Sequence, residues 1–61
     1  MKFRELRKLV EQDGWFHDSQ KGSHAHYEHP TKKGKVTIAG HPNDDVPPGL
    51  LNAILKQTGL K

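Results

Sequence analysis

The chain has 61 residues and no cysteine, and its ten Lys and Arg against seven Asp and Glu give a formal net charge of +3. This length predicts a single small domain over residues 1–61, which buries only about 60% of the surface that the unfolded chain exposes. Without cysteine there is no disulfide and no thiolate ligand, which fits a reducing, cytoplasmic compartment. The apolar runs are far shorter than a membrane-spanning helix, which needs about 20 residues. These short runs predict no membrane partner, and the positive charge favours a polyanion or an acidic protein as partner.

Residues 2–13 are predicted to form an amphipathic helix, because Phe3, Leu6, Leu9 and Val10 recur at helical spacing and Gly14 follows as a stop signal. The start of this helix carries no Ser, Thr, Asp or Asn as a cap, and its first turns hold cations where the helix dipole favours anions. Those cations are candidate contacts for phosphate groups, and an ordinary solvated face is the alternative. They are Arg4, Arg7 and Lys8.

Three short strands are predicted to follow. The first covers 15–19 and ends in a tight turn at 20–22, the second covers 22–29, and the third covers 35–40 after a turn at 30–34. Trp15 and Phe16 lie on opposite faces of a strand, and one of them is expected in the core. An exposed partner could stack on a base, but burial is the expectation in so small a protein, and neither residue is placed in the site. Val36 and Ile38 point to one side of the third strand.

A loop at 41–48 leads into a second predicted helix at 48–58, with Asp44 and Asp45 near its start and Gly59 at its end. Its buried stripe is predicted to consist of Leu50, Leu51, Ile54 and Leu55. A three-stranded antiparallel sheet needs a cover on its apolar face, and only the two helices can supply it. The predicted fold is therefore α+β, in the α-β-β-β-α order of the double-stranded RNA-binding domain.

The segment 22–29 contains three of the five histidines, and imidazole transfers protons near neutral pH without a cofactor. In a strand, His24, His26 and Glu28 share one face. RNA carries its own nucleophile, the 2'-OH, so a histidine and a few cations suffice to cleave it. A solvated strand surface is the alternative that spacing alone favours. A metal site is disfavoured, because His29 lies on the opposite face from His24 and His26 and no cysteine completes a tetrahedron.

The residues Gly22-Ser23-His24 at the opening of the second strand, followed by His41-Pro42 and by the ending Ile54-Leu55-Lys56-Gln57-Thr58-Gly59-Leu60, closely resemble the HicA family of toxins. The resemblance runs from about Phe3 to Leu60. It implies a small endoribonuclease, an mRNA interferase of a type II toxin–antitoxin system, which is neutralised by a HicB-type antitoxin. It also implies that His24 is the catalytic residue, while His26, His29 and His41 stay ambiguous.

The expected mechanism makes His24 the general base on the 2'-OH, with no metal or other cofactor and no small-molecule partner. His26 is a possible general acid, and Lys21 and Lys35 are possible supports for the negative charge that develops on phosphorus. Lys32 and Lys33 in the turn before the third strand are further candidate RNA contacts. Two alternatives stay open, a non-catalytic RNA-binding module of the double-stranded RNA-binding type and a domain that only binds an acidic protein partner.

Overall fold

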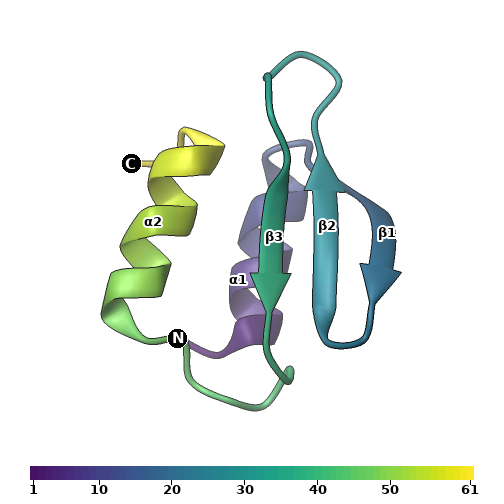
Figure 1. The fold of residues 1–61 in the computed structure, drawn as a ribbon. Coiled ribbons are helices and arrows are strands. Elements are labelled where there is room, and N and C mark those ends of the chain that lie inside the picture. The colour runs from purple at the N-terminus through teal and green to yellow at the C-terminus, as the bar shows by residue number, and fades with distance from the viewer.

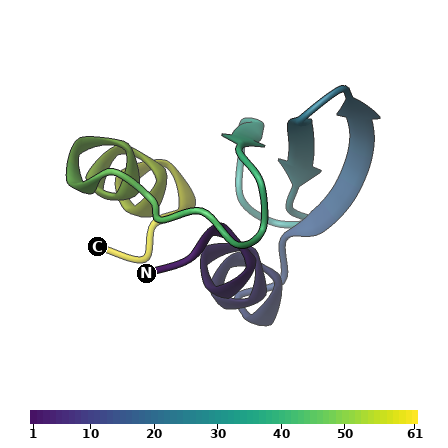
Figure 2. The same ribbon diagram turned by 90° about the horizontal axis from the view of Figure 1, so that it is seen from below.

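The computed structural model describes residues 1–61 and has the predicted order of elements. They are α1 (Phe3–Gln12), β1 (Phe16–Lys21), β2 (His24–Glu28), β3 (Val36–Ala39) and α2 (Pro48–Thr58). The strands form one antiparallel sheet in the order β1-β2-β3 (Figure 1). Figure 1 shows α1 behind the sheet and α2 beside β3, and the view from below in Figure 2 shows that the opposite face of the sheet carries no helix. The predicted α+β fold of the double-stranded RNA-binding type is confirmed.

The core consists of ten buried apolar residues that both helices, β2, β3 and the connecting segments contribute. They are Phe3, Leu6, Val10, Trp15, Ala25, Tyr27, Val36, Ile38, Val46 and Ile54. The predicted stripe of α2 was wrong in part, because only Ile54 of its four members is buried, and Leu50 is 37% exposed. Thr58 is buried instead, and its hydroxyl donates to the carbonyl oxygen of Ile54 at 2.9 Å. This hydrogen bond to the carbonyl oxygen four residues earlier in the helix satisfies the hydroxyl group, so that the polar side chain can be buried in the core.

The start of α1 is capped by a distant loop. The amides of Phe3 and Arg4 donate to the carbonyl oxygens of Asp44 (3.0 Å) and Pro42 (3.1 Å). The Glu5 carboxylate accepts from the Lys2 amide at 2.8 Å, and the Lys2 ammonium lies 3.1 Å from Asp45. These contacts satisfy amide groups that a helix N-terminus leaves free. The missing local cap is thus explained, and Asp44 and Asp45 serve α1 and not the start of α2.

The first hairpin turns later than predicted. Lys21 pairs with His24, so the turn is Gly22-Ser23 and not residues 20–22. Gly22 has a φ of 60°, and a glycine at the first position of a two-residue loop matches the twist of the flanking strands. The register of β1 also shifts between His17 and Ser19, which marks a β-bulge at Asp18. The extra residue resets the alternation of faces along β1.

Candidate functional site

The face of the sheet that no helix covers carries a group of polar side chains. On β2, Ala25 and Tyr27 are buried toward α1, so His24, His26 and Glu28 point the other way, as predicted. The strand register adds neighbours from β1 and β3 to the same face. We call this the outer face, formed by Phe16, Ser19, Lys21, His24, His26, Glu28, Thr37 and Ala39. No pocket was found in the structure.

His24 occupies the end of the outer face next to the Gly22-Ser23 turn. Its side chain is exposed, and it makes no hydrogen bond to another residue. Lys21 is its direct partner on β1, and Ala39 is its partner on β3. The β-carbons of residues directly opposite each other on antiparallel strands lie about 5 Å apart. His24 thus presents an exposed imidazole without a hydrogen-bond partner, opposite Lys21 on β1 and Ala39 on β3.

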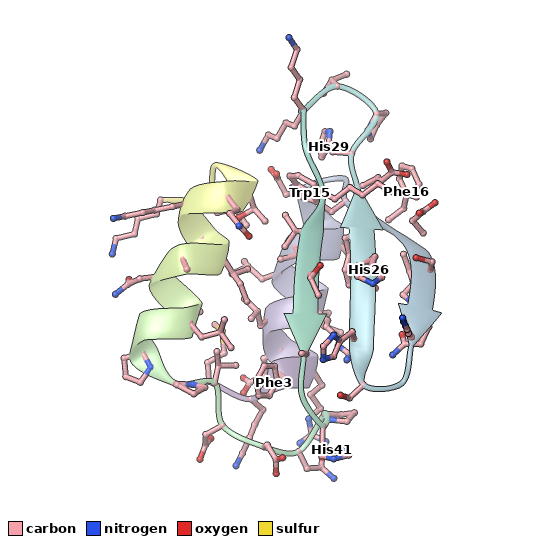
Figure 3. All side chains as sticks on the ribbon, viewed as in Figure 1. Phe3, Trp15, Phe16, His26, His29 and His41 are labelled. Carbon is pink, nitrogen blue, oxygen red and sulfur yellow. The ribbon has the colours of Figure 1, made fainter.

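His26 lies two residues farther along the same face, and Figure 3 shows it midway along β2. Its Nδ1 atom lies 2.9 Å from the hydroxyl oxygen of Thr37 on β3. This contact fixes the orientation of the ring and leaves Nε2 free to face a ligand. Sequence reasoning missed Thr37, because its position beside His26 depends on the register of β2 with β3 across the seven-residue connection 29–35.

His29 has a structural role, because both nitrogen atoms of its ring make hydrogen bonds within the fold. His29 accepts hydrogen bonds at Nδ1 from the amides of Thr31 and Lys32, both at 3.1 Å, and its Nε2 lies 2.8 Å from the carbonyl oxygen of Asp13. These partners assign Nε2 as the donor. The ring also meets Trp15 edge to face at 5.2 Å. His29 therefore joins the end of α1 to the loop before β3 and takes no part in the outer face.

His17 points to the helix side of β1, where its Nε2 lies 2.9 Å from Gln20 Oε1 and its ring meets Tyr27 edge to face at 5.7 Å. His41 is exposed after the end of β3 and, like His24, makes no hydrogen bond. Figure 3 shows His41 beyond the end of β3, at the opposite end of the sheet from His29. Only His24 combines a free imidazole with a position on the outer face.

The candidate cations are spread over both ends of the molecule. Lys21 lies beside His24, as expected, but Lys35 precedes β3, whose far end pairs with His24. Lys35 and Ala39 are four positions apart, which is about 13 Å of strand. Lys35 is therefore poorly placed to support His24. This part of the prediction is corrected, because it ignored the antiparallel direction of β3.

The Lys32 ammonium makes contacts within the protein, and these contacts argue against its predicted role in RNA binding. Its ammonium pairs with the Asp13 carboxylate and donates to the Thr58 carbonyl oxygen at 2.8 Å, where it complements the C-terminal dipole of α2. The hydrogen bond from Lys32 holds the pKa of Asp13 below its usual value of 3.8. Lys33, in contrast, is exposed.

The cations of α1 are more accessible. Lys8 is exposed, and Arg4 is exposed with its guanidinium 3.0 Å from Asn43 Oδ1. Arg7 is half-buried, donates to the Gly40 carbonyl oxygen at 3.3 Å, and has its Nε buried without a partner. Arg4 and Arg7 thus hold the loop after β3 at the end of the sheet that carries His24.

Tyr27 is unsuited to act with His24. It is buried on the helix side of β2, and its hydroxyl donates to Glu11 at 3.4 Å. Burial, followed by the charge of Glu11, raises the pKa of Tyr27 above its usual value of 10.0. A phenol on the wrong face that holds its proton this firmly cannot serve the outer face, as its opposite orientation predicted.

Comparison with known proteins gives the family. A search of curated proteins gave no match. Neither helix is long and apolar enough to cross a membrane. The family model described as the HicA toxin of bacterial toxin–antitoxin systems matches residues 3–60 of the 61-residue chain. The match covers all five elements of the fold and the whole of the outer face. The chain therefore belongs to the HicA toxin family.

Proposed function

We propose that this protein is a metal-independent endoribonuclease that cleaves mRNA with His24 as general base. The observation that carries the proposal is the free imidazole of His24 on the outer face, with Lys21 directly opposite. Family membership supports the activity, since HicA toxins cleave mRNA. An exposed face suits a long polymer that must lie across the site, whereas a small substrate would need a pocket.

In the proposed reaction, His24 takes the proton of a 2'-OH, and the 2'-oxygen attacks the adjacent phosphorus. The bond from phosphorus to the 5'-oxygen breaks, and the leaving oxygen takes a proton from a general acid. The products are a 2',3'-cyclic phosphate and a 5'-OH. His26 is the proposed acid, because it follows His24 on the same face and Thr37 holds its ring. The Lys21 ammonium stabilises the charge that develops on phosphorus.

We further propose that a HicB-type antitoxin neutralises this activity in the cytoplasm by covering the outer face. A partner with acidic groups near His24 and Lys21 complements the net charge of +3. The second candidate function is a non-catalytic RNA-binding module, which the fold of the double-stranded RNA-binding type favours. The nuclease is expected to cut the RNA that it binds, whereas the binding module is expected to leave the RNA intact.

The test is incubation of the protein with a long single-stranded RNA in EDTA, followed by analysis of the fragment ends. His24→Ala is expected to lower the cleavage rate by about 10²- to 10⁴-fold, the usual contribution of a general base. His17→Ala is the matched control, because it removes an exposed histidine from the opposite face of the same sheet. Both variants are checked for folding by circular dichroism. RNA that is bound but left intact by the wild type would support the binding module instead.

A further inference from the structure

An exposed aromatic residue and an unpaired carboxylate lie side by side on the outer face, away from His24. Phe16 is 48% exposed, although phenylalanine is usually buried, and no other aromatic ring packs on it. Glu28 is its direct cross-strand partner and has no ion pair or side-chain hydrogen bond. Figure 3 shows Phe16 at the start of β1, beyond His26. The proposed reaction uses neither residue.

The bulge at Asp18 determines which residues of β1 share the outer face. In an unbroken strand, Phe16 and Lys21 would point to opposite faces, because they are five positions apart and faces alternate at every position. The register shift between His17 and Ser19 brings Phe16, Ser19 and Lys21 onto the same face. Phe16 thus belongs to the surface that continues to Lys21 and His24.

We propose that Phe16 and Glu28 form a base-binding subsite for single-stranded RNA, which rests on the proposed function of the outer face. Glu28 lies four residues from His24 on β2, or about 13 Å along the strand. A base next to the cleaved nucleotides can therefore reach Phe16 while the scissile phosphate lies at His24 and Lys21. The exposed ring offers a stacking platform, which is sequence-tolerant because every base has a π-face.

The carboxylate gives this subsite a preference among bases. A phosphate would be repelled by Glu28, so the group that meets this end of the face is a base edge and not the backbone. Carboxylates accept hydrogen bonds from exocyclic amino groups, as from N4 of cytosine. Guanine, adenine and cytosine have such a group, whereas the N3–H of uracil lies between two carbonyl oxygens that the carboxylate repels. The subsite therefore selects an amino-bearing base over uracil.

Binding is measured with fluorescent 12-nucleotide RNAs, oligo(C) and oligo(U), in the His24→Ala background so that the RNA stays intact. Phe16→Ala is expected to weaken the binding of both RNAs by about 5-fold or more, from the loss of one stacked base. Phe16→Trp is expected to restore binding. Leu50→Ala is the matched control, because it removes another exposed apolar side chain, from α2. Glu28→Gln is expected to bind both RNAs and to lose the preference for oligo(C).

Equal binding by the Phe16→Ala and Leu50→Ala variants would overturn the subsite, and Phe16 would then be assigned to a protein contact. These measurements distinguish a failure of the subsite from a failure of the proposed nuclease activity. If the protein with His24 intact cuts RNA while Phe16→Ala changes neither binding nor the cleavage pattern, only the subsite fails. If binding depends on Phe16 and Glu28 but the wild type never cuts, only the nuclease fails.

Discussion

Individual histidines in this protein differ in what they contact, and His29 is the clearest structural case. His29→Ala removes the acceptor of two loop amides, the contact with the Asp13 carbonyl oxygen and the packing on Trp15. We expect the free energy of unfolding to fall by about 2–3 kcal/mol, because several groups lose a partner at once. His17→Ala, which removes one exposed hydrogen bond, should cost less than about 1 kcal/mol. Urea denaturation at pH 7 measures both values, and equal losses would contradict the assignment.

The sequence alone predicted the site only in part. The alternation of a strand correctly placed His24, His26 and Glu28 on one face, because this pattern needs only local geometry. The partners of Lys32 and His29 come from Asp13 and Thr58, which lie far away in the chain. Lys32 and Lys33 therefore received the same predicted role in RNA binding, and only the fold distinguished the engaged Lys32 from the exposed Lys33.

At the scale of the elements, the docking of α1 onto the end of β3 depends on a glycine. Gly40 has a φ of 153°, and a β-carbon added there would lie 2.5 Å from the ring of Phe3, which is in the core. Gly40→Ala is expected to destabilise the protein by about 2–5 kcal/mol through backbone strain and overpacking. Gly34→Ala is the control, because Gly34 also has a positive φ, of 90°, but faces open space. Its cost should be about 1 kcal/mol, and thermal denaturation of both variants checks the difference.

The ion pair of Lys32 with Asp13 joins the ends of both helices and makes stability depend on acid pH. Because Lys32 holds the folded-state pKa of Asp13 below 3.8, the unfolded chain takes up this proton first as the pH falls. The pair therefore contributes its stabilisation above pH 3.8 and loses it progressively as the pH falls through the lower, folded-state value. Asp13→Asn should lower the stability at pH 7 and flatten the acid limb of the stability curve. Asp18→Asn, at a position without an ion pair, should leave that limb unchanged in urea titrations between pH 2 and pH 7.

Element bounds were predicted more closely than element geometry. The second helix was predicted at 48–58 and spans Pro48–Thr58, because proline at its start and Gly59 at its end are local signals. The β-bulge in β1 was not predicted, since nothing in the composition of residues 16–21 marks an extra residue. The bulge results from pairing with β2, and so does the shared face of Phe16 and Lys21.

At the scale of the whole molecule, RNA binding should depend on where the charges lie and not on the net charge of +3. Lys21→Gln and Lys56→Gln both lower the net charge by one, but Lys21 lies beside His24 and Lys56 lies in the last turn of α2. Each phosphate contact on a single strand contributes about 0.7 to the slope of log K against log salt concentration. We therefore expect Lys21→Gln to reduce this slope by about 0.7 and Lys56→Gln to leave it unchanged. The measurement is fluorescence anisotropy in the His24→Ala background at several salt concentrations. Equal slopes for the two variants would mean that RNA binds through the overall positive charge of the protein and not at a defined site. This result would exclude the outer face as the RNA-binding surface.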